Sequence, residues 1–298
     1  MSGVVPFLLV DVFAGEPLAG NPLAVVPDAE VLDTGTMARI AREFNQSETT
    51  FVLPPSAPGA DWRLRSFTAA GIEVFGAGHN SLGAWWWLAE SGRLPLSAAG
   101  GDFVQEMGTR RLPVRIDCDA GRLVSVGLTQ TAPVFGGVYI AHKELAAALG
   151  LTERELISHE IPTQVVSTGA AHLLVAVRNR AALARAHPDL SRLAHVLEFA
   201  EAQGCYLFSL DPVAPEAAAH TRFFNPTEGI PEDAATGSAA GPLACHLVQH
   251  GLVKDGATVW IEQGHSMGRP SVIEVRLAGE RVQVYGQCVT AAEGKLRW

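Results

Sequence analysis

Apolar side chains recur along this chain in two spacings, one typical of helices and one typical of strands. Over residues 33–45 and 187–204 they return at every third or fourth position, which predicts amphipathic helices with one buried face. Asp33 precedes the first helix as its cap, and Asn45 ends it. Alternating segments follow each helix and predict strands. These strands cover 48–55 and 61–69 after the first helix, and 205–212 and 220–226 after the second.

The same order of elements in both halves of the chain indicates an internal duplication. Gly78 and Gly237 lie 159 positions apart (237 − 78), and Gly121 and Gly279 lie 158 apart (279 − 121). The last two glycines each occupy an Ala-Gly turn between alternating segments, which predicts similar hairpins. We therefore predict two domains. One contains residues 1–130, with the tail from about 288 to 298 packed on it, and the other contains residues 131–287.

The segments that begin at Gly78 and Gly237 predict two helices that are apolar on nearly all sides. Such helices belong in the interior, wrapped by sheet. Their first turns consist of small or polar residues, which leaves backbone N–H groups uncovered at the positive end of the helix dipole. A helix start of this kind can bind an anion such as a carboxylate. The alternative interpretation is that the small residues only permit tight packing of helix on sheet.

A few polar residues near these helix starts are candidates for chemistry. Glu48 lies at a helix-to-strand junction, just before an apolar run, and an enclosed carboxyl group with a raised pKa suits proton transfer. His79 and Asn80 begin one central helix, while Asp233 and Ser238 flank the start of the other. The alternatives are that Glu48 is a solvated strand-start residue, and that His79 and Asp233 only cap their helices.

Composition and charge exclude several classes of function. The 298 residues are 48% hydrophobic and 18% charged, which is typical of a globular protein, and the net charge of -9 offers no basic surface for nucleic acid. No apolar run reaches the roughly 18 residues of a membrane span. The first residues lack the basic region and the cleavage pattern of a signal peptide. We therefore expect a cytoplasmic protein.

The spacing of cysteines and histidines argues against a bound metal, and the absence of known cofactor-binding motifs argues against a cofactor. The four cysteines lie far apart with no Cys-x-x-Cys, and the ten histidines show no familiar ligand spacing. The stretch GAGHNS begins like a dinucleotide-binding loop, but Ser81 stands where the third glycine is needed. The chain has no phosphate loop and no Gly-x-Ser-x-Gly elbow.

Four motifs, in order along the chain, carry a resemblance to a known family. They are DVFAGEPLAGNPLAVV, AREFNQSETTFVLPP, FTAAGIEVFGAGHNSLG and RFFNPTEGIPEDAATGSAAGPLACHL. Together they resemble the phenazine-biosynthesis PhzF-like isomerases. The resemblance implies the α+β fold of diaminopimelate epimerase, with two pseudo-symmetric domains and the active site in the cleft between them. In this fold each domain is a mixed or antiparallel sheet curled around a central helix.

The resemblance also implies a mechanism that needs no cofactor. Glu48 matches the glutamate that acts as general acid and base, moving a proton within a small unsaturated carboxylic acid. A homodimer is implied as well. The residues expected to line the substrate and hold its carboxylate are Ser47, Gly78, His79, Asn80, Asp233, Gly237 and Ser238.

Two other functions stay open at this point. One is racemisation, epimerisation or dehydration of an amino or hydroxy acid on the same fold, and the other is metabolite binding without turnover. Epimerases of this fold place a cysteine at the start of each central helix, whereas this chain has Ala77 and Ala235 there. Cys245 lies about two turns inside its helix, too deep to reach a substrate. Ala234 replaces a proline usual in the PhzF-like family, so the substrate is open.

Overall fold

The structure is a computed structural model that describes residues 3–298 and divides into two compact units. The first unit contains the chain up to Thr129 together with Tyr285–Trp298, and the second contains Gln130–Val284. The C-terminal segment thus returns to the first unit. In the described part of the chain, no helix has the length and apolar character that crossing a membrane requires.

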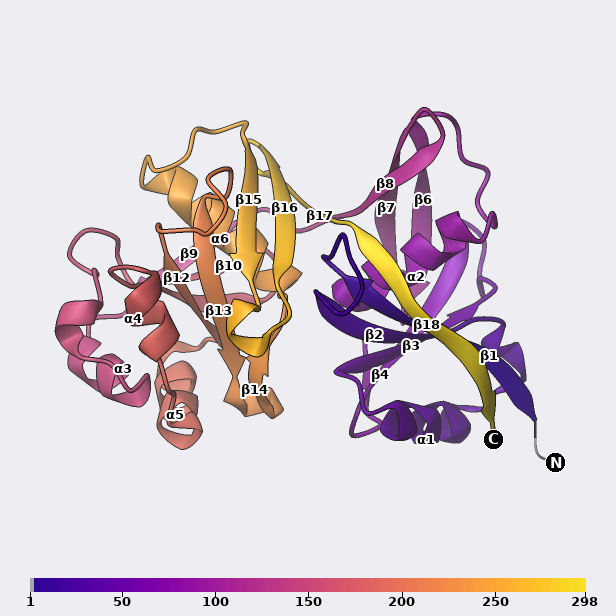
Figure 1. The fold of residues 1–298 in the computed structure, drawn as a ribbon, viewed down its shortest axis with the longest axis horizontal. Helices are drawn as coiled ribbons and strands as arrows, with labels where there is room; N and C mark the ends of the chain where they lie inside the picture. The colour runs from indigo at the N-terminus through magenta and orange to yellow at the C-terminus, as the bar shows by residue number, and fades with distance from the viewer. Residues whose placement is uncertain (1–2) are drawn as a thin grey trace. The chain divides into compact units, whose positions relative to one another are not determined.

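The first unit is a mixed sheet in which antiparallel neighbours predominate (Figure 1). Among its described strand pairs, β2/β3 and β4/β6 are parallel, and the two-residue strand β5 (Glu73–Val74) adds to β4. In spatial order the strands are β18 (Cys288–Arg297), β1 (Val4–Val12), β2 (Asn21–Val26), β3 (Glu48–Leu53), β4 (Trp62–Thr68), β6 (Gly100–Met107), β7 (Arg110–Asp119) and β8 (Arg122–Thr129).

The second unit repeats this strand pattern. The pairs β11/β12 and β13/β15 are parallel, at the places of the two parallel pairs of the first unit, and β14 (Ile230–Asp233) adds to β13. The predicted duplication and the predicted α+β fold class are confirmed. The strands are β9 (Val134–Val138), β10 (Gln164–Ser167), β11 (Ala171–Ala176), β12 (Gly204–Ser209), β13 (Ala219–Asn225), β15 (Thr258–Gln263), β16 (Ser271–Ala278) and β17 (Arg281–Gly286).

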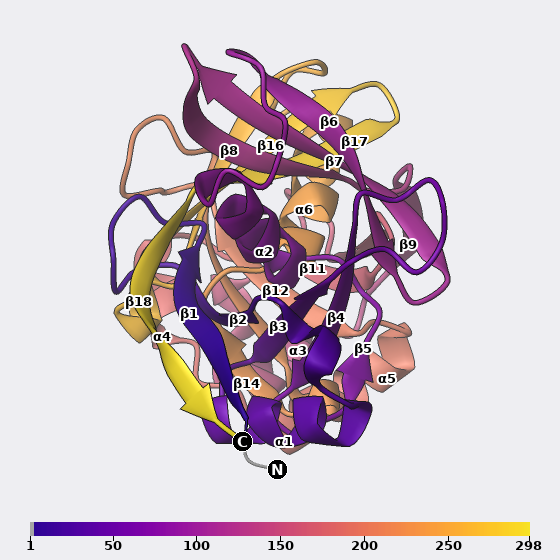
Figure 2. The same cartoon turned by 90° about the vertical axis from the view of Figure 1, so that its right-hand side faces the viewer.

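A central helix lies inside each sheet. Helix α2 (His79–Glu90) contacts β1, β2, β3, β4, β8 and β18 of its unit (Figure 2), and α6 (Gly237–Gln249) contacts β10, β11 and β16. Trp85, Trp86 and Trp87 of α2 are all buried, as expected for a helix that lies in the interior. Enclosure by sheet explains why both helices are apolar on nearly every side.

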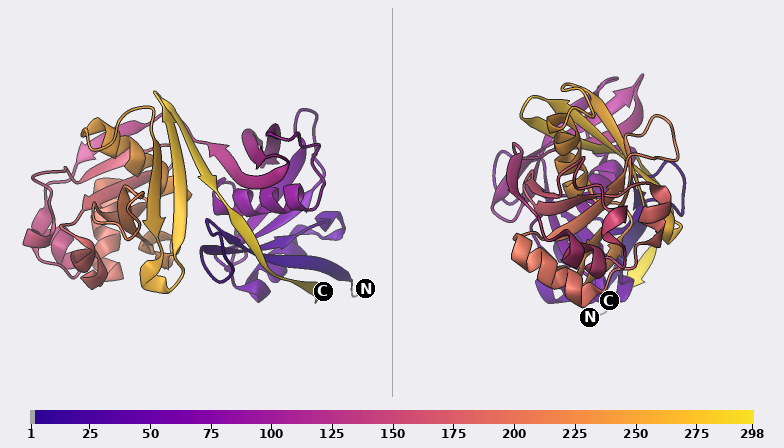
Figure 3. Two further views of the ribbon diagram at one scale, coloured as in Figure 1. Left: turned by 45° about the horizontal axis from the view of Figure 1, so that its top comes forward. Right: turned by 90° about the vertical axis from the view of Figure 1, so that its left-hand side faces the viewer.

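Other helices cover the opposite face of each sheet. In the first unit α1 (Thr34–Phe44) packs Met37 and Ile40 against Phe51 and Phe67. Asp33 caps it by accepting a hydrogen bond from the Thr36 N–H at 2.7 Å, and Asn45 ends it at φ 52°, as predicted. In the second unit the matching face is covered by α3 (His142–Ala148), α4 (Arg180–Arg185) and α5 (Leu190–Ala200), which lie together in Figures 1 and 3. Short 3-10 turns connect elements at Ala29–Val31 (η1), Glu153–Glu155 (η2), Pro226–Glu228 (η3) and His265–Met267 (η4).

Each central helix has a glycine in its second turn, where the sheet comes very close. A Cβ at Gly83 would lie 2.7 Å from Leu23 Cδ2 and 2.9 Å from Val12 Cγ2. A Cβ at Gly241 would lie far inside contact distance of Gln130 Oε1. Gln130 donates to the Gly237 carbonyl at 2.9 Å and accepts from Thr168 Oγ1 at 2.6 Å. Gly241 therefore makes room for a side chain that holds the first turn of α6.

We predict that Gly241→Ala destabilises the protein by about 2 kcal/mol, because displacing Gln130 breaks two hydrogen bonds and outweighs the roughly 1 kcal/mol that alanine gains in a helix. Urea unfolding followed by circular dichroism measures the change. The matched control is Gly137→Ala, since a Cβ at Gly137 has nothing within 4 Å. A Gly241→Ala protein as stable as this control would contradict the packing argument.

Burial keeps several histidines neutral, and this makes stability depend on pH. Desolvation lowers the pKa of His79, His172 and His246 to about 4 from an ordinary value of 6.5. In the unfolded chain these imidazoles take up protons as the pH falls below 6.5, whereas the folded protein resists protonation until about pH 4. Their contribution is therefore complete above pH 6.5 and is lost as the pH falls toward 4.

We predict that the free energy of unfolding falls between pH 6.5 and pH 4, by up to roughly 3 kcal/mol for each buried histidine. Urea titrations at half-unit pH steps measure it. His246→Leu should make this slope shallower, because one of the proton-binding groups is gone. Ser191→Ala, which changes an exposed residue of α5 that takes up no proton in this range, should leave the slope unchanged. An unfolding free energy that is flat down to pH 4 would contradict the neutral state of these groups.

Candidate active site

The start of α2 is shaped by the side chain of Asn80. Its Oδ1 accepts hydrogen bonds from the Gly78 N–H at 2.7 Å and the Ser81 N–H at 2.8 Å, and its Nδ2 donates to the Gly76 carbonyl at 2.9 Å. Asn80 is buried. The expectation that the amides of this first turn are uncovered is therefore wrong for Ser81, whose N–H is covered by the neighbouring side chain. Asn80 holds the loop that presents His79.

Glu48 and His79 come together in the first unit. Glu48 is the first residue of β3, and its Oε2 lies 4.0 Å from Nδ1 of His79, the first residue of α2. The side chain of Glu48 is 21% exposed to solvent and that of His79 is 13% exposed. Ser47 Oγ lies 3.2 Å from His79 Nε2 and 3.5 Å from Asn21 Oδ1. Both ring nitrogens of His79 therefore face polar groups of the predicted site.

The charge state of His79 defines the chemistry available here. Burial lowers its pKa to about 4, so the imidazole is neutral at neutral pH. The contact with Glu48 is therefore one between a carboxyl group and a neutral ring. A carboxylate in such a place can accept a proton from carbon, while the neutral ring can donate or accept a hydrogen bond.

The start of α6 is held by a buried glutamine of β15. Gln263 Nε2 donates to the Asp233 carbonyl at 2.8 Å and to Thr236 Oγ1 at 3.0 Å, and its Oε1 accepts from the Thr236 N–H at 3.1 Å. Thr236 Oγ1 donates in turn to the Asp233 carboxylate at 2.5 Å. This network fixes Asp233 and the turn that precedes Gly237.

Ser238 has a histidine partner that the sequence analysis did not identify. Its Oγ lies 3.2 Å from Nε2 of His172, a buried residue of β11 whose pKa burial lowers to about 4. The arrangement matches Ser47 and His79 in the first unit, where a serine hydroxyl also contacts a neutral imidazole. Asp233, Gly237, Ser238 and His172 are thus brought together in the second unit.

The duplication itself could have revealed another of the missed residues. Gln105 of β6 accepts from Trp85 Nε1 at 2.9 Å and donates to Ser81 Oγ at 2.9 Å, so it holds the central helix of the first unit as Gln263 holds that of the second. Gln105 and Gln263 lie 158 positions apart (263 − 105), the displacement already visible in the glycines. His172 has no such signal in its local sequence.

The thiols lie outside this chemistry. Cys205, Cys245 and Cys288 are buried, and burial raises the pKa of each, that of Cys245 to about 11. Such thiols stay protonated at neutral pH and are poor bases. Elsewhere in residues 3–298, one group of potential metal ligands lies close together, consisting of His220, Glu262 and His265. It does not include any residue of the predicted site.

Solved structures resemble this fold over its whole length. The PhzF-family phenazine biosynthesis protein of Bacillus anthracis matches with a TM-score of 0.89 at 27% identity, covering 99% of both chains. A hydroxyproline epimerase from Agrobacterium vitis, covering 99% of this chain and 92% of its own, matches with a TM-score of 0.64 at 14% identity. The second likeness concerns the fold alone.

Sequence comparison gives the same relationship. The trans-2,3-dihydro-3-hydroxyanthranilate isomerase of Pseudomonas aeruginosa is 38% identical, over 97% of this chain and 98% of its own, and that of Pseudomonas chlororaphis is 35% identical over the same shares. The profile of the phenazine biosynthesis-like proteins, PhzC-PhzF, matches residues 10–294. Because the match extends over nearly the whole sequence, this chain belongs to the phenazine biosynthesis-like PhzC-PhzF family.

Proposed function

We propose that this protein, an isomerase by its family, shifts a proton within a small unsaturated carboxylic acid and uses no cofactor. Glu48 is the general acid and base. The observation that carries the proposal is the contact of Glu48 with His79 at the start of α2, where burial keeps the imidazole neutral. A fully solvated Glu48 on the outer surface would favour a role without turnover. The Glu48 side chain is only 21% exposed to solvent, which supports a role in catalysis.

The proposed reaction needs one proton-accepting group. The Glu48 carboxylate takes a proton from one carbon of the substrate, and the electron pair of that C–H bond moves into the unsaturated system. A proton is then returned at another carbon, so the double bonds shift and the composition of the molecule is unchanged. Neutral His79 can donate or accept a hydrogen bond. A positively charged imidazolium in its place would make the Glu48 carboxylate a weaker base.

The second unit is proposed to supply substrate-binding groups. Gly237 and Ser238 are the first two residues of α6, and the N–H groups of a first helical turn have no partner within the helix, so they suit a carboxylate. The Ser238 hydroxyl can add a further hydrogen bond, since His172 fixes its position. Because Ala234 departs from the family pattern, the substrate need not be the one in the relatives' names.

The alternatives receive less support. Two-base racemisation with thiols needs an ionisable cysteine at each helix start, and burial raises the pKa of the thiol in α6, Cys245, to about 11. Relatives from three Pseudomonas species, which are 35–38% identical to this chain, are named as isomerases. The homodimer and the cytoplasmic location stay predictions from the sequence.

We predict that Glu48→Gln lowers turnover at least about 1,000-fold, because glutamine keeps the shape of the side chain but cannot accept a proton. The measurement is deuterium incorporation from D2O into trans-2,3-dihydro-3-hydroxyanthranilate first, then into other small unsaturated acids, followed by mass spectrometry. Glu43→Gln, the same change at an exposed position of α1, is the matched control. Exchange by Glu48→Gln within tenfold of the unchanged protein, at equal thermal stability, would rule Glu48 out as the base.

We predict that Ser238→Ala raises KM about tenfold and changes kcat less than about threefold, because it removes one hydrogen bond to a charged group of the bound substrate. Steady-state kinetics on the substrate found above measures both constants. Ser191→Ala, at an exposed position of α5, should change neither. An unaltered KM in Ser238→Ala would remove this residue from the binding site.

A further inference from the structure

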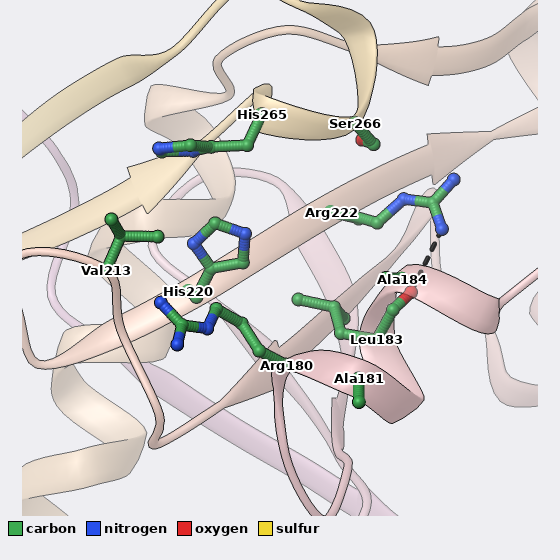
Figure 4. A pocket seen from close by; sticks show the side chains of 9 residues that line it. All are labelled: Arg180, Ala181, Leu183, Ala184, Val213, His220, Arg222, His265 and Ser266. Carbon is green, nitrogen blue, oxygen red and sulfur yellow. Dashed lines mark hydrogen bonds between the residues drawn. The ribbon is translucent and has the colours of Figure 1, made fainter.

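Three side chains with metal-ligand atoms meet on the second unit, away from the start of α6. His220 lies on β13, Glu262 on β15, and His265 begins the turn η4. One ligand atom from each lies within 4.8 Å of the others. His220 and Glu262 are buried, whereas His265 is exposed, and Figure 4 shows the two imidazoles beside one another at the pocket. Their ring centroids are 4.6 Å apart.

Glu262 orients His220. Its Oε1 accepts from the Ala214 N–H at 2.7 Å, and its Oε2 accepts from the Val213 N–H at 2.8 Å and from His220 Nδ1 at 2.9 Å. This bond places His220 Nδ1 and Glu262 Oε2 at a spacing that suits two ligands of one ion. An ion that binds between them replaces the hydrogen, because a metal-bound imidazole nitrogen carries no proton.

The pocket beside these residues has room for an ion and its water. It has a volume of about 450 Å³ and is lined by Arg180, Leu183, Val213, Arg222 and Ser266 in addition to the two histidines. Arg222 is neutralised by Glu232 through two hydrogen bonds of 2.8 Å. Arg180 donates to the Pro212 carbonyl at 3.2 Å and lies 3.8 Å from the Asp211 carboxylate. The pocket therefore carries little uncompensated positive charge.

We propose that His220, Glu262 and His265 form a binding site for a divalent transition-metal ion of the Zn²⁺ type. Two imidazoles and one carboxylate are ligands that zinc accepts, whereas Mg²⁺ and Ca²⁺ prefer oxygen ligands alone. Tetrahedral zinc with bonds of about 2.05 Å brings its ligand atoms to roughly 3.3 Å from one another. His265 closes this gap because its side chain extends from an exposed turn. Water fills the remaining coordination position from the pocket.

A site with three protein ligands and one position left to water holds zinc less tightly than a closed site with four protein ligands, so we expect a dissociation constant in the micromolar range. The bound ion would cross-link β13, β15 and η4. This site does not depend on the proposed function.

The test is zinc binding by the full chain, measured by competition with a chromogenic chelator and by the visible absorption of Co²⁺ in its place. We expect one equivalent of Zn²⁺ to bind in that range and to raise the melting temperature, since an ion selective for the folded state stabilises it. His265→Ala should weaken binding at least tenfold. Glu262→Gln should weaken it at least tenfold, because it removes the carboxylate ligand.

A second pair of close imidazoles provides the matched control. His246 of α6 and His250, the residue that caps the end of this helix, have ring centroids 4.5 Å apart, so zinc bound there would be lost in His250→Ala. The proposal requires that His250→Ala bind zinc as the unchanged protein does. It is overturned if the unchanged protein binds no zinc below about 100 µM, if His265→Ala binds as well as the unchanged protein, or if His250→Ala rather than His265→Ala loses the ion.

Discussion

Enclosure of a helix by a curled sheet is the constraint on which the rest of each unit depends. A helix so enclosed has no solvent face, so its residues must be apolar, and wherever the sheet comes close they must also be small. Gly83 and Gly241 meet this demand in the second turn of α2 and α6. The small residues at the helix starts belong to the same pattern. Tight packing of helix against sheet therefore accounts for the small residues of both helices, as the alternative interpretation of the sequence expected.

Enclosure also decides the charge of the polar groups that remain inside. A buried imidazole loses its hydration, and this loss disfavours its protonated form, which is why His79 and His172 are neutral. Glutamines secure the helix starts without adding charge, Gln105 in the first unit and Gln263 in the second. Each unit thus presents a serine and a neutral histidine at the start of its central helix. In the first unit the Glu48 carboxylate also lies 4.0 Å from this histidine, whereas in the second unit the Asp233 carboxylate accepts a hydrogen bond from Thr236.

Local sequence predicted the elements well because local forces determine them. The cap at Asp33, the end at Asn45 and the alternating strands each depend on residues close in the chain. The candidate substrate-binding residues around Gly78 and Gly237 could also be selected from the sequence, because the internal duplication identifies both helix starts. The role of Asn80 could not be predicted from the sequence. An asparagine at a helix start can bond to its own loop, as Asn80 does, or face a ligand, and the local sequence is the same in both cases. His172 was hidden as well, since its partner Ser238 lies 66 residues further on.

Strand alternation separates the two polar regions of the second unit. Adjacent residues of a strand point to opposite faces, so Gln263 reaches the start of α6 while Glu262 reaches His220 on the other side of β15. On β13, Thr221 bonds to the Glu262 carbonyl at 2.7 Å between His220 and Arg222, which both line the outer pocket. Spacing along the chain could not reveal this cluster, because β13 and β15 are neighbours only through a parallel pairing that brings His220 opposite Glu262. The backbone of two consecutive residues therefore joins the cluster to the network around Asp233, and any ion that fixes Glu262 also restrains Gln263.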